Sequence, residues 1–342
     1  MPAPSPMHVL RLVGLVLALG LAGCSRTAPG RSVVVYVSID QVHAEPVLRE
    51  FERRSGIAVR AVFDIEAAKA TGLASRLVAE KSRPQADLFW NSEFVQTLRL
   101  KRLGVLAVSR PRRAAAPPAH LQDRDGCWHA SGARFRVILA NTDRLSAAGR
   151  PRRWEDFASP AYPASDLVVA TPLFGTSADQ AAALYAAWGP ERARRLYAAL
   201  QARGVRVVDG NSVVRDLVVQ GTAAAGWTDS DDACGAVKKG APVEMILPEQ
   251  DQQGTLLVPG TIARIAGAPH PAEALALMEF LLDPATERML IESGFFQLSV
   301  NPGGPAHACL GGAEVRTLAV SLDEIGAQLD ASGQDMNSIF GR

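Results

Sequence analysis

The segment Asp166-Leu-Val-Val-Ala-Thr-Pro-Leu-Phe-Gly-Thr-Ser-Ala-Asp-Gln-Ala-Ala-Ala-Leu-Tyr-Ala-Ala-Trp188 joins a short apolar run to an alanine-rich run. Leu167–Ala170 has the length and composition of a buried β-strand. Asp179–Trp188 consists largely of strong helix formers, and Gly189-Pro190 is a sequence that ends helices. We therefore predict a strand followed by a helix, the repeating unit of α/β proteins.

The connection between this strand and this helix contains Gly175, Thr176 and Ser177. Gly175 allows a tight turn, and either hydroxyl side chain can cap the helix. The first turn of a helix has amide N–H groups without partners and a partial positive charge, and both favour anions. The connection therefore predicts an anion-binding site, although an ordinary capped junction without a ligand would have the same residues.

The same alternation of strands and helices extends along the chain. Predicted strands occupy Val33–Val37, Ile57–Phe63, Ala86–Trp90, Val205–Asp209 and Ala223–Trp227. Helices separate strands of this kind in parallel α/β sheets. Arg134–Asn141 is a further strand, which we expect to cross between two parts of the molecule. With 342 residues and 48% hydrophobic content, the chain is long enough to form two globular lobes.

Polar residues follow several of the predicted strands. They form the groups Ser38–Gln41, Asp64–Glu66, Asn91–Glu93 and Thr228–Asp232. In open α/β sheets, ligands bind beyond the carboxyl ends of the strands. We therefore expect these groups to lie along one edge of the fold and to contribute to a binding site.

Composition and motifs argue against several classes of function. The formal net charge of +1 does not indicate a nucleic-acid partner. The chain has no G-x-S-x-G elbow, P-loop, H-E-x-x-H motif or G-x-G-x-x-G fingerprint. An enzyme on the same scaffold would have to rely on Glu93 and Asp229 as a carboxylate pair, whose separation the sequence does not fix. We expect a binding protein and not an enzyme.

The first residues have the features of an export signal. The apolar stretch Leu12–Leu21 has the length of a signal-peptide core and is too short to span a bilayer. Leu21-Ala-Gly-Cys24 resembles a bacterial lipobox, in which Cys24 is lipidated. We expect residues 1–23 to be a lipoprotein signal peptide and residues 24–31 to be a polar tether. The mature protein would then lie in the periplasm or cell envelope, held to a bacterial membrane by its lipid anchor alone. A plain signal peptide that contains a cysteine is the alternative.

Three cysteines remain if Cys24 carries the lipid, namely Cys127, Cys234 and Cys309. An odd number in an oxidising compartment allows at most one intramolecular disulfide. The sequence does not fix which two would pair. Their spacing does not match a metal site, so we expect them to be structural or free.

Five short motifs, in this order, resemble the periplasmic solute-binding proteins of ABC importers, in particular the branch named for iron(III) binding. The motifs are Tyr36-Val-Ser-Ile-Asp-Gln41, Phe89-Trp-Asn-Ser-Glu93, Thr171-Pro-Leu-Phe-Gly-Thr176, Trp227-Thr-Asp-Ser-Asp-Asp-Ala233 and Leu298-Ser-Val-Asn-Pro302. The likeness spans nearly all of the chain after the export signal.

The resemblance implies an α/β fold of the type II periplasmic-binding-protein class. In it, two lobes, each with a parallel or mixed sheet flanked by helices, are joined by hinge strands. We expect residues 32–138 to form the first part of lobe 1 and residues 139–249 to form lobe 2. Residues 250–342 would complete lobe 1 and form the C-terminal helices. The protein would be a monomer without a resident cofactor. It would capture a small charged solute between closing lobes and deliver it to the permease and ATPase subunits of an importer.

The ligand that the resemblance implies is iron(III) bound together with an anion. Ferric members of the family bind the metal with two neighbouring tyrosines, often with a glutamate, and a bound anion completes the shell. Glu93 matches the glutamate position, and Gly175–Ser177 match the anion-binding loop. The tyrosine positions fall at Thr228–Ser230, where this chain has no tyrosine. Glu93 and Asp229 are then the candidate metal ligands, since carboxylate oxygens suit hard cations.

The candidate site also fits an organic anion without iron. Its residues are Ser38, Asp40, Asn91, Glu93, Gly175, Thr176, Ser177, Asn211, Ser212, Trp227, Thr228 and Asp229. A phosphonate group would bind at the helix start, and the ammonium of an aminophosphonate would face the carboxylates. Arg215 could neutralise these acids in place of a cation from the ligand. Both ligand classes remain predictions of the sequence.

Overall fold

The computed structural model describes residues 30–64, 71–112, 116–312 and 314–341. The predicted signal peptide, Cys24, most of the tether and Glu66 lie outside these ranges. Residues 32–342 make up one compact unit. Among the described residues, no helix is both long enough and apolar enough to cross a membrane.

Strands and helices alternate along the unit, as the sequence predicts. The first group of elements is β1 (Ser32–Val37), α2 (Gln41–Ser55), β2 (Ala58–Phe63), α3 (Thr71–Ala79), β3 (Leu88–Asn91), α4 (Val95–Arg102), β4 (Leu106–Ala107) and β5 (His129–Asn141). The second is β6 (Leu167–Ala170), α5 (Gly175–Trp188), α6 (Pro190–Arg203), β7 (Arg206–Val208), α7 (Asn211–Val219), β8 (Ala225–Asp229), α8 (Ser230–Lys238) and β9 (Val243–Ile246). The last is β10 (Leu257–Ile265), α9 (Pro271–Leu281), α10 (Pro284–Glu292), α11 (Leu322–Ala327) and α12 (Leu329–Phe340), with a 3-10 turn, η6, at Ala308–Leu310.

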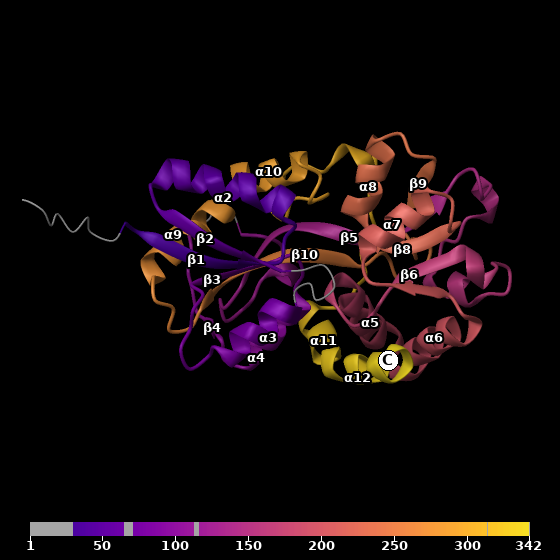
Figure 1. The fold of residues 1–342 in the computed structure, drawn as a ribbon, viewed down its shortest axis with the longest axis horizontal. Helices are drawn as coiled ribbons and strands as arrows, with labels where there is room; N and C mark the ends of the chain where they lie inside the picture. The colour runs from indigo at the N-terminus through magenta and orange to yellow at the C-terminus, as the bar shows by residue number, and fades with distance from the viewer. Residues whose placement is uncertain (1–29, 65–70, 113–115, 313, 342) are drawn as a thin grey trace, which may run out of the picture. The chain divides into compact units, whose positions relative to one another are not determined.

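The strands pair in the order β2-β1-β3-β10-β5-β8-β6-β7, with β4 beside β10 and β9 beside β5. β1 is parallel to β2 and β3, and β6 is parallel to β7 and β8. β5 is antiparallel to all its partners; its first residues pair with β10, and its later residues pair with β8 and β9. This long strand therefore belongs to both halves of the sheet (Figure 1).

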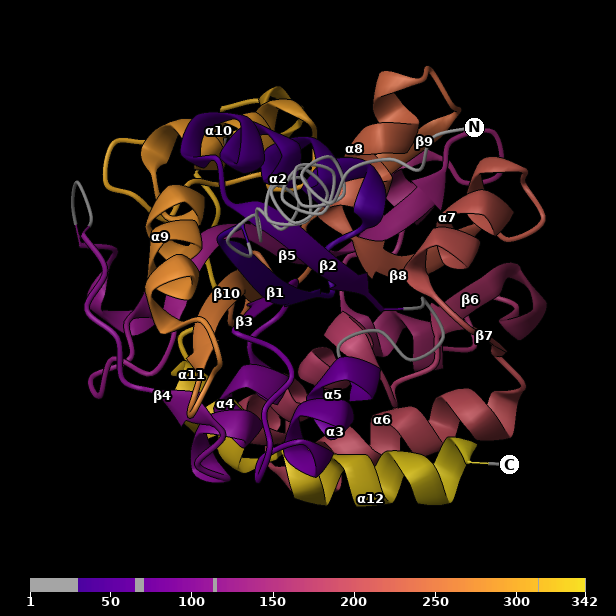
Figure 2. The same ribbon diagram turned by 60° about the vertical axis from the view of Figure 1, so that its left-hand side comes forward.

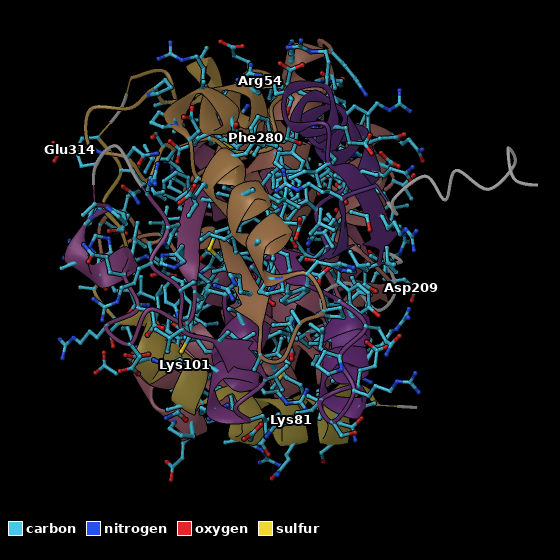
Figure 3. The ribbon with its side chains drawn as sticks, turned by 90° about the vertical axis from the view of Figure 1, so that its left-hand side faces the viewer. Arg54, Lys81, Lys101, Asp209, Phe280 and Glu314 are labelled. Atoms are coloured by element: carbon cyan, nitrogen blue, oxygen red, sulfur yellow. A yellow bond between two sulfur atoms is a disulfide. The ribbon has the colours of Figure 1, made fainter. Side chains whose placement is uncertain are left out.

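Helices cover both faces of the sheet (Figures 1 and 2). Alternate residues of β1 show this arrangement, because side chains alternate between the two faces of a strand. Val33, Val35 and Val37 pack in one core cluster with residues of α2, α9 and α10, whereas Tyr36 packs in another with residues of α3 and α4. At the edge of the cluster that holds Val33, Val35 and Val37, the guanidinium carbon of Arg54 in α2 lies 5.7 Å from the ring centroid of Phe280 in α9 (Figure 3).

The C-terminal helix α12 packs against α5 and α6. Met336 of α12 is fully buried in the core cluster that holds Trp227 and Tyr197. The rings of Phe340 and Tyr197 meet edge to face, with their centroids 6.2 Å apart. The end of the chain therefore stabilises the half of the sheet that contains β6, β7 and β8.

Helix α5 begins at Gly175, earlier than the sequence predicts. Phe174 is its N-cap residue, and no side chain caps it. The prediction that Thr176 or Ser177 caps this helix is therefore wrong. The Thr176 hydroxyl is instead committed to Asp229, to which it donates a hydrogen bond of 2.7 Å.

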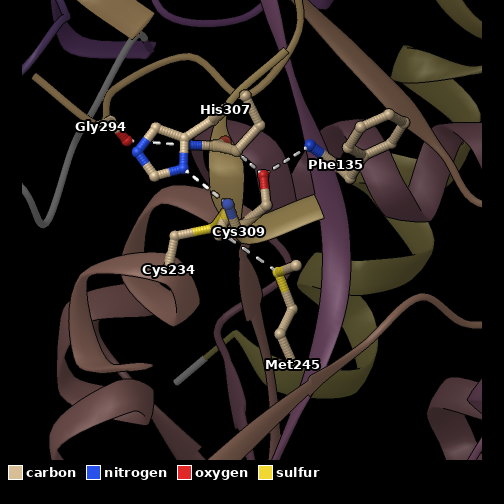
Figure 4. The surroundings of a disulfide bond; sticks show 8 residues. Phe135, Cys234, Met245, Gly294, His307 and Cys309 are labelled. Atoms are coloured by element: carbon tan, nitrogen blue, oxygen red, sulfur yellow. Dashed lines mark hydrogen bonds between the residues drawn. A yellow bond between two sulfur atoms is a disulfide. The ribbon is translucent and has the colours of Figure 1, made fainter. Parts of the chain in front are cut away.

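Cys234 and Cys309 form a disulfide, which resolves the pairing that the sequence leaves open (Figure 4). The bond joins α8 to the turn η6 across a sequence separation of 75 residues. Cys127 is the free cysteine among the described residues.

Candidate ligand-binding site

A cavity of about 300 Å³ lies at the carboxyl ends of β1, β3, β6, β7 and β8. It is lined by Asp40, Val42, Ser92, Arg134, Ala170, Thr171, Phe174, Gly175, Thr176, Ser177, Asp209, Gly210, Asn211, Ser212, Arg215, Asp229, Asp231 and Asp232. Its position is the one that the strand-end rule predicts for ligands of α/β sheets.

Most of the predicted site residues line this cavity, and the others lie behind it. The lining members are Asp40, Gly175, Thr176, Ser177, Asn211, Ser212 and Asp229. The members that do not line it are Ser38, Asn91, Glu93, Trp227 and Thr228. All five of the latter are buried.

Two helices direct their first turns at the cavity. α5 begins after Phe174 and α7 begins after Gly210, and neither helix has a side-chain cap. The amide N–H groups of their first turns therefore have no partner within the helix. The hydroxyls of Ser177 and Ser212 lie beside these amides, and neither hydroxyl bonds to another described residue. Such an arrangement of amides and hydroxyls suits an anionic oxygen.

Arg136 lies behind the cavity, fully buried on β5. Its Nη1 donates hydrogen bonds to Asp229 Oδ1 at 2.7 Å and to Asn211 Oδ1 at 2.9 Å. Its Nε donates to Gln180 Oε1 of α5 at 2.9 Å. This one guanidinium therefore ties together β8, α7 and α5, the elements that build one side of the cavity.

Asp229 has both carboxylate oxygens occupied by protein donors. While Oδ1 accepts from Arg136, Oδ2 accepts from Thr176 Oγ1 at 2.7 Å and from Asn211 Nδ2 at 3.1 Å. Arg134 Nη1 lies a further 3.3 Å from Oδ2. Burial opposes ionisation of Asp229, but the charges of Arg136 and Arg134 outweigh burial and lower the pKa of this carboxyl. Asp229 is a charged group whose partners the protein itself supplies.

Arg134 crosses the floor of the cavity. Its Nη1 donates to Asp231 Oδ2 at 2.9 Å, and its Nη2 donates to the Ser92 carbonyl at 3.0 Å. The guanidinium carbon lies 4.8 Å from the ring centroid of Phe295. These contacts fix a buried cation between the loop after β3 and the first turn of α8.

Neither arginine is among the site residues that the sequence predicts, because Arg134–Asn141 is predicted only as a crossing strand. The signal was present, because Arg134 and Arg136 stand two residues apart in an otherwise apolar run and therefore share one face of the strand. Charged residues are rarely buried unless they are paired. Two of them on one face of a central strand point to a buried polar site.

Arg215 of α7 neutralises a third acid. Its Nη1 donates to Asp232 Oδ1 at 2.7 Å, and Thr228 Oγ1 donates to Asp232 Oδ2 at 3.2 Å. Arg215 is therefore an internal cation for one of the acids, the role that the sequence offers as an alternative to a cation from the ligand. Arg134, Arg136 and Arg215 thus offset Asp229, Asp231 and Asp232 within the protein.

Glu93 is fully buried next to the cavity and has its own partners. Its Oε1 accepts from Asn91 Nδ2 at 2.6 Å, and both of its carboxylate oxygens accept from the Gln96 N–H at 3.2 Å. Glu93 also hydrogen bonds to Asp179 of α5. Burial raises the pKa of Glu93, and burial together with the charge of Glu93 raises the pKa of Asp179 well above its ordinary value. Burial and the neighbouring charge of Glu93 therefore favour the protonated form of Asp179.

The remaining predicted residues support the structure around the cavity. Ser38 Oγ donates to Asn91 Oδ1 at 2.5 Å and accepts from the Ser92 N–H at 2.8 Å. Trp227 lies in the core, with its ring centroid 5.1 Å from that of Trp154 and 5.0 Å from that of Phe157. None of the described tyrosines lines the cavity.

The residues from 33 to 296 match the family model of the bacterial extracellular solute-binding proteins. The chain belongs to this family. It is therefore a solute-binding protein that acts outside the cytoplasm, and not an enzyme.

Solved structures of similar fold bind different solutes. The ferric binding protein from Campylobacter jejuni has a TM-score of 0.82 at 20% sequence identity, with 91% of this chain and 100% of that chain covered. Iron-bound HitA from Pseudomonas aeruginosa has a TM-score of 0.78 at 18% identity, with 90% and 99% covered. The periplasmic binding protein AfuA from Actinobacillus pleuropneumoniae, with fructose-6-phosphate bound, has a TM-score of 0.79 at 19% identity, with 91% and 99% covered. These similarities establish the α/β periplasmic-binding-protein fold.

Proposed function

We propose that this protein is the substrate-binding component of an ABC importer and that it captures a small organic anion with a phosphate or phosphonate group. Residues 32–138 and most of residues 250–342 would form one lobe, and residues 139–249 the other, which α12 covers by packing against α5 and α6. β5 and the connection from β9 to β10 would be the hinge, because they link the two halves of the sheet. The lobes would close on the solute without covalent chemistry. Cys24 would carry the lipid that holds the protein at the membrane.

The observation that carries the anion proposal is the pair of uncapped helix starts at the cavity. The first turns of α5 and α7 offer amide N–H groups, and Ser177 and Ser212 add hydroxyls. Arg134 lines the same cavity and offsets the charges of Asp229 and Asp231 there. A phosphate or phosphonate group accepts many hydrogen bonds at once, so it matches this set of donors.

Iron(III) fits this cavity less well than an anion. Tyrosinate, the hard donor of the ferric members, has no counterpart among the described residues of the lining. Asp229 is engaged by two arginines, and the buried carboxylate of Glu93 accepts hydrogen bonds from Asn91 and Gln96. A metal ion at either carboxylate would have to displace these partners and approach fixed positive charges.

The test is calorimetric titration and thermal shift of the mature protein with inorganic phosphate, glucose-6-phosphate, 2-aminoethylphosphonate and iron(III) citrate. A ligand at about a hundred times its dissociation constant stabilises the fold by about 2.7 kcal/mol. Ser177→Asp should weaken anion binding by about tenfold or more, because it places a negative charge beside the amides. Ser177→Asn, which is similar in size and uncharged, is the matched control.

An opposite result would identify a metal-binding protein. Stabilisation by iron(III) that persists in Ser177→Asp and is lost in Asp229→Asn would refute the anion proposal. Asp229→Asn leaves Arg134 and Arg136 without this buried carboxylate, so its melting temperature without ligand is measured first and every ligand-induced shift is taken from that baseline.

A further inference from the structure

A second cavity, of about 610 Å³, lies next to the first. Its walls come from the start of α2, from the later turns of α8, and from the segments at Ser293-Gly294 and His307. It shares five lining residues with the first cavity, namely Asp40, Val42, Arg215, Asp231 and Asp232. A solute held in the first cavity can therefore extend past the Arg215–Asp232 ion pair into the second.

Helix α8 connects the two cavities along its length. Its first turn, with Asp231 and Asp232, lines both, whereas Gly235 and Lys238 line the second cavity alone. Side chains three or four residues apart lie on the same face of a helix, so Asp231, Gly235 and Lys238 form a continuous strip. The strip begins at Asp231, which Arg134 neutralises, and ends at the basic residue Lys238.

The basic end of the strip offers charges for a second anionic group. Among the described residues, the ammonium groups of Lys238 and the adjacent Lys239 form no ion pair with a carboxylate. His307 lines the same wall and accepts a hydrogen bond from the Cys309 N–H on Nδ1 at 3.2 Å. In the neutral ring this leaves the proton on Nε2. Burial and the nearby charge of Lys238 lower the pKa of His307, which favours its neutral ring.

The wall that faces α8 is held in place by covalent and hydrogen bonds (Figure 4). The Cys234–Cys309 disulfide joins it to α8. The backbone carbonyl of Gln297 accepts from the His307 N–H at 2.8 Å. Its side chain donates from Nε2 to the Gly294 carbonyl at 2.7 Å and accepts on Oε1 from Ser230 Oγ at 2.5 Å. The second cavity is therefore bounded by ordered elements on both sides.

We propose that the solute is a bifunctional organic anion whose phosphate or phosphonate group binds in the first cavity and whose second acidic group binds at Lys238 and Lys239 in the second. This inference rests on the proposed function and specifies its substrate class. A sugar bisphosphate or a phosphorylated sugar acid has the required charges and length. Inorganic phosphate would occupy the first cavity alone.

Gly235 offers a direct test, because it lines the second cavity and not the first. A Cβ atom built at Gly235 meets no other atom within 4 Å, and its backbone is in the ordinary helical conformation. Gly235→Trp should therefore fill the cavity without disturbing the fold, with Gly235→Ala as the matched control. Lys238→Gln with Lys239→Gln removes the charges, and Lys238→Arg with Lys239→Arg keeps them.

The experiment is calorimetric titration of the mature protein and these variants with inorganic phosphate, glucose-6-phosphate and fructose-1,6-bisphosphate. In the unmodified protein the bisphosphate should bind about tenfold more tightly than the monophosphate, because it gains a charge-assisted contact. Gly235→Trp and the double glutamine variant should lose this advantage and retain phosphate binding. Gly235→Ala and the double arginine variant should keep the advantage.

The outcomes separate this inference from the proposed function. Equal binding of the monophosphate and the bisphosphate, or an advantage that survives in Gly235→Trp, would overturn the second site and leave the first. Absence of binding by all three anions would overturn the proposed function itself.

Discussion

At the residue scale, the site depends on a buried charge network centred on Asp229. Its carboxylate accepts from Arg136, Thr176 and Asn211, and Arg134 lies close by. Removing one partner of a buried ion pair leaves a charge that neither water nor protein stabilises. The network therefore positions the first turns of α5 and α7, and its loss should affect the fold before it affects binding.

We predict that Arg136→Met destabilises the protein by about 3–5 kcal/mol, because Asp229 stays buried without its nearest cation. Denaturant-induced unfolding would measure the loss. Arg206→Met, at an exposed position of β7, is the control and should change stability little. The double variant Arg136→Met with Asp229→Asn should recover part of the loss. A double variant as unstable as the single one would mean that packing, and not charge, explains the effect.

The Glu93–Asp179 pair makes a prediction about pH. The folded protein raises the pKa of both carboxyls. The stability that comes with these raised pKa values is therefore complete below the ordinary carboxyl pKa and is lost as pH rises through the raised pKa of Asp179. Asparagine at position 179 does not titrate, so the melting temperature of Asp179→Asn should fall less than that of the unmodified protein as pH rises above the ordinary carboxyl pKa. Asp143→Asn, at an exposed position, is the control. If the melting temperatures of all three proteins depended on pH in the same way, the raised pKa of Asp179 would be contradicted.

Residues within one βα connection could be predicted from the sequence, whereas their distant partners could not. Gly175, Thr176 and Ser177 follow from local rules for helix starts and do line the cavity. Arg136 and Asp229 are 93 residues apart, and only the pairing of β5 with β8 brings them together. From the sequence alone, without this strand register, Asp229 is interpreted as an acid whose charge a cation of the ligand would neutralise.

At the element scale, two neighbouring strands both approach one aromatic ring closely. Gly132 of β5 and Gly260 of β10 both face Phe296, and a Cβ atom at Gly132 would lie 2.3 Å from that ring. β10 shifts its register against β5 between Pro259 and Thr261. Glycine within a strand often marks a close approach of this kind. The sequence shows the glycines, but it cannot show what approaches them.

We predict that Gly132→Ala destabilises the protein by about 1–3 kcal/mol more than its backbone strain alone would, because the methyl group collides with Phe296. Gly240→Ala is the matched control, since Gly240 has a φ of +74° against +86° at Gly132 but no atom within 4 Å of a built Cβ. Denaturant midpoints of the two variants would give the difference. Equal losses would show that Phe296 moves aside at no cost and that only the backbone conformation matters.

At the scale of the whole molecule, the alternation of strands and helices predicts the α/β class, and the family match and similar structures confirm it. The position of the C-terminal helix does not follow from alternation. α12 contacts α5 and α6, although about 130 residues of chain separate it from them. Its placement depends on the apolar surface that Tyr197 and its neighbours leave open, and no local pattern encodes that surface.

The Cys234–Cys309 disulfide acts at the same scale, because it links α8 to a turn 75 residues further along the chain. A loop of this length should contribute about 4 kcal/mol through the lower entropy of the unfolded chain. Cys234→Ser with Cys309→Ser should therefore lower the denaturant midpoint, and reduction of the unmodified protein should do the same. Cys127→Ser removes the free thiol without opening the loop and should have little effect. If the double serine variant and Cys127→Ser were equally stable, the native contacts of α8 alone would hold this wall of the second cavity, and the protein would not depend on an oxidising compartment for its stability.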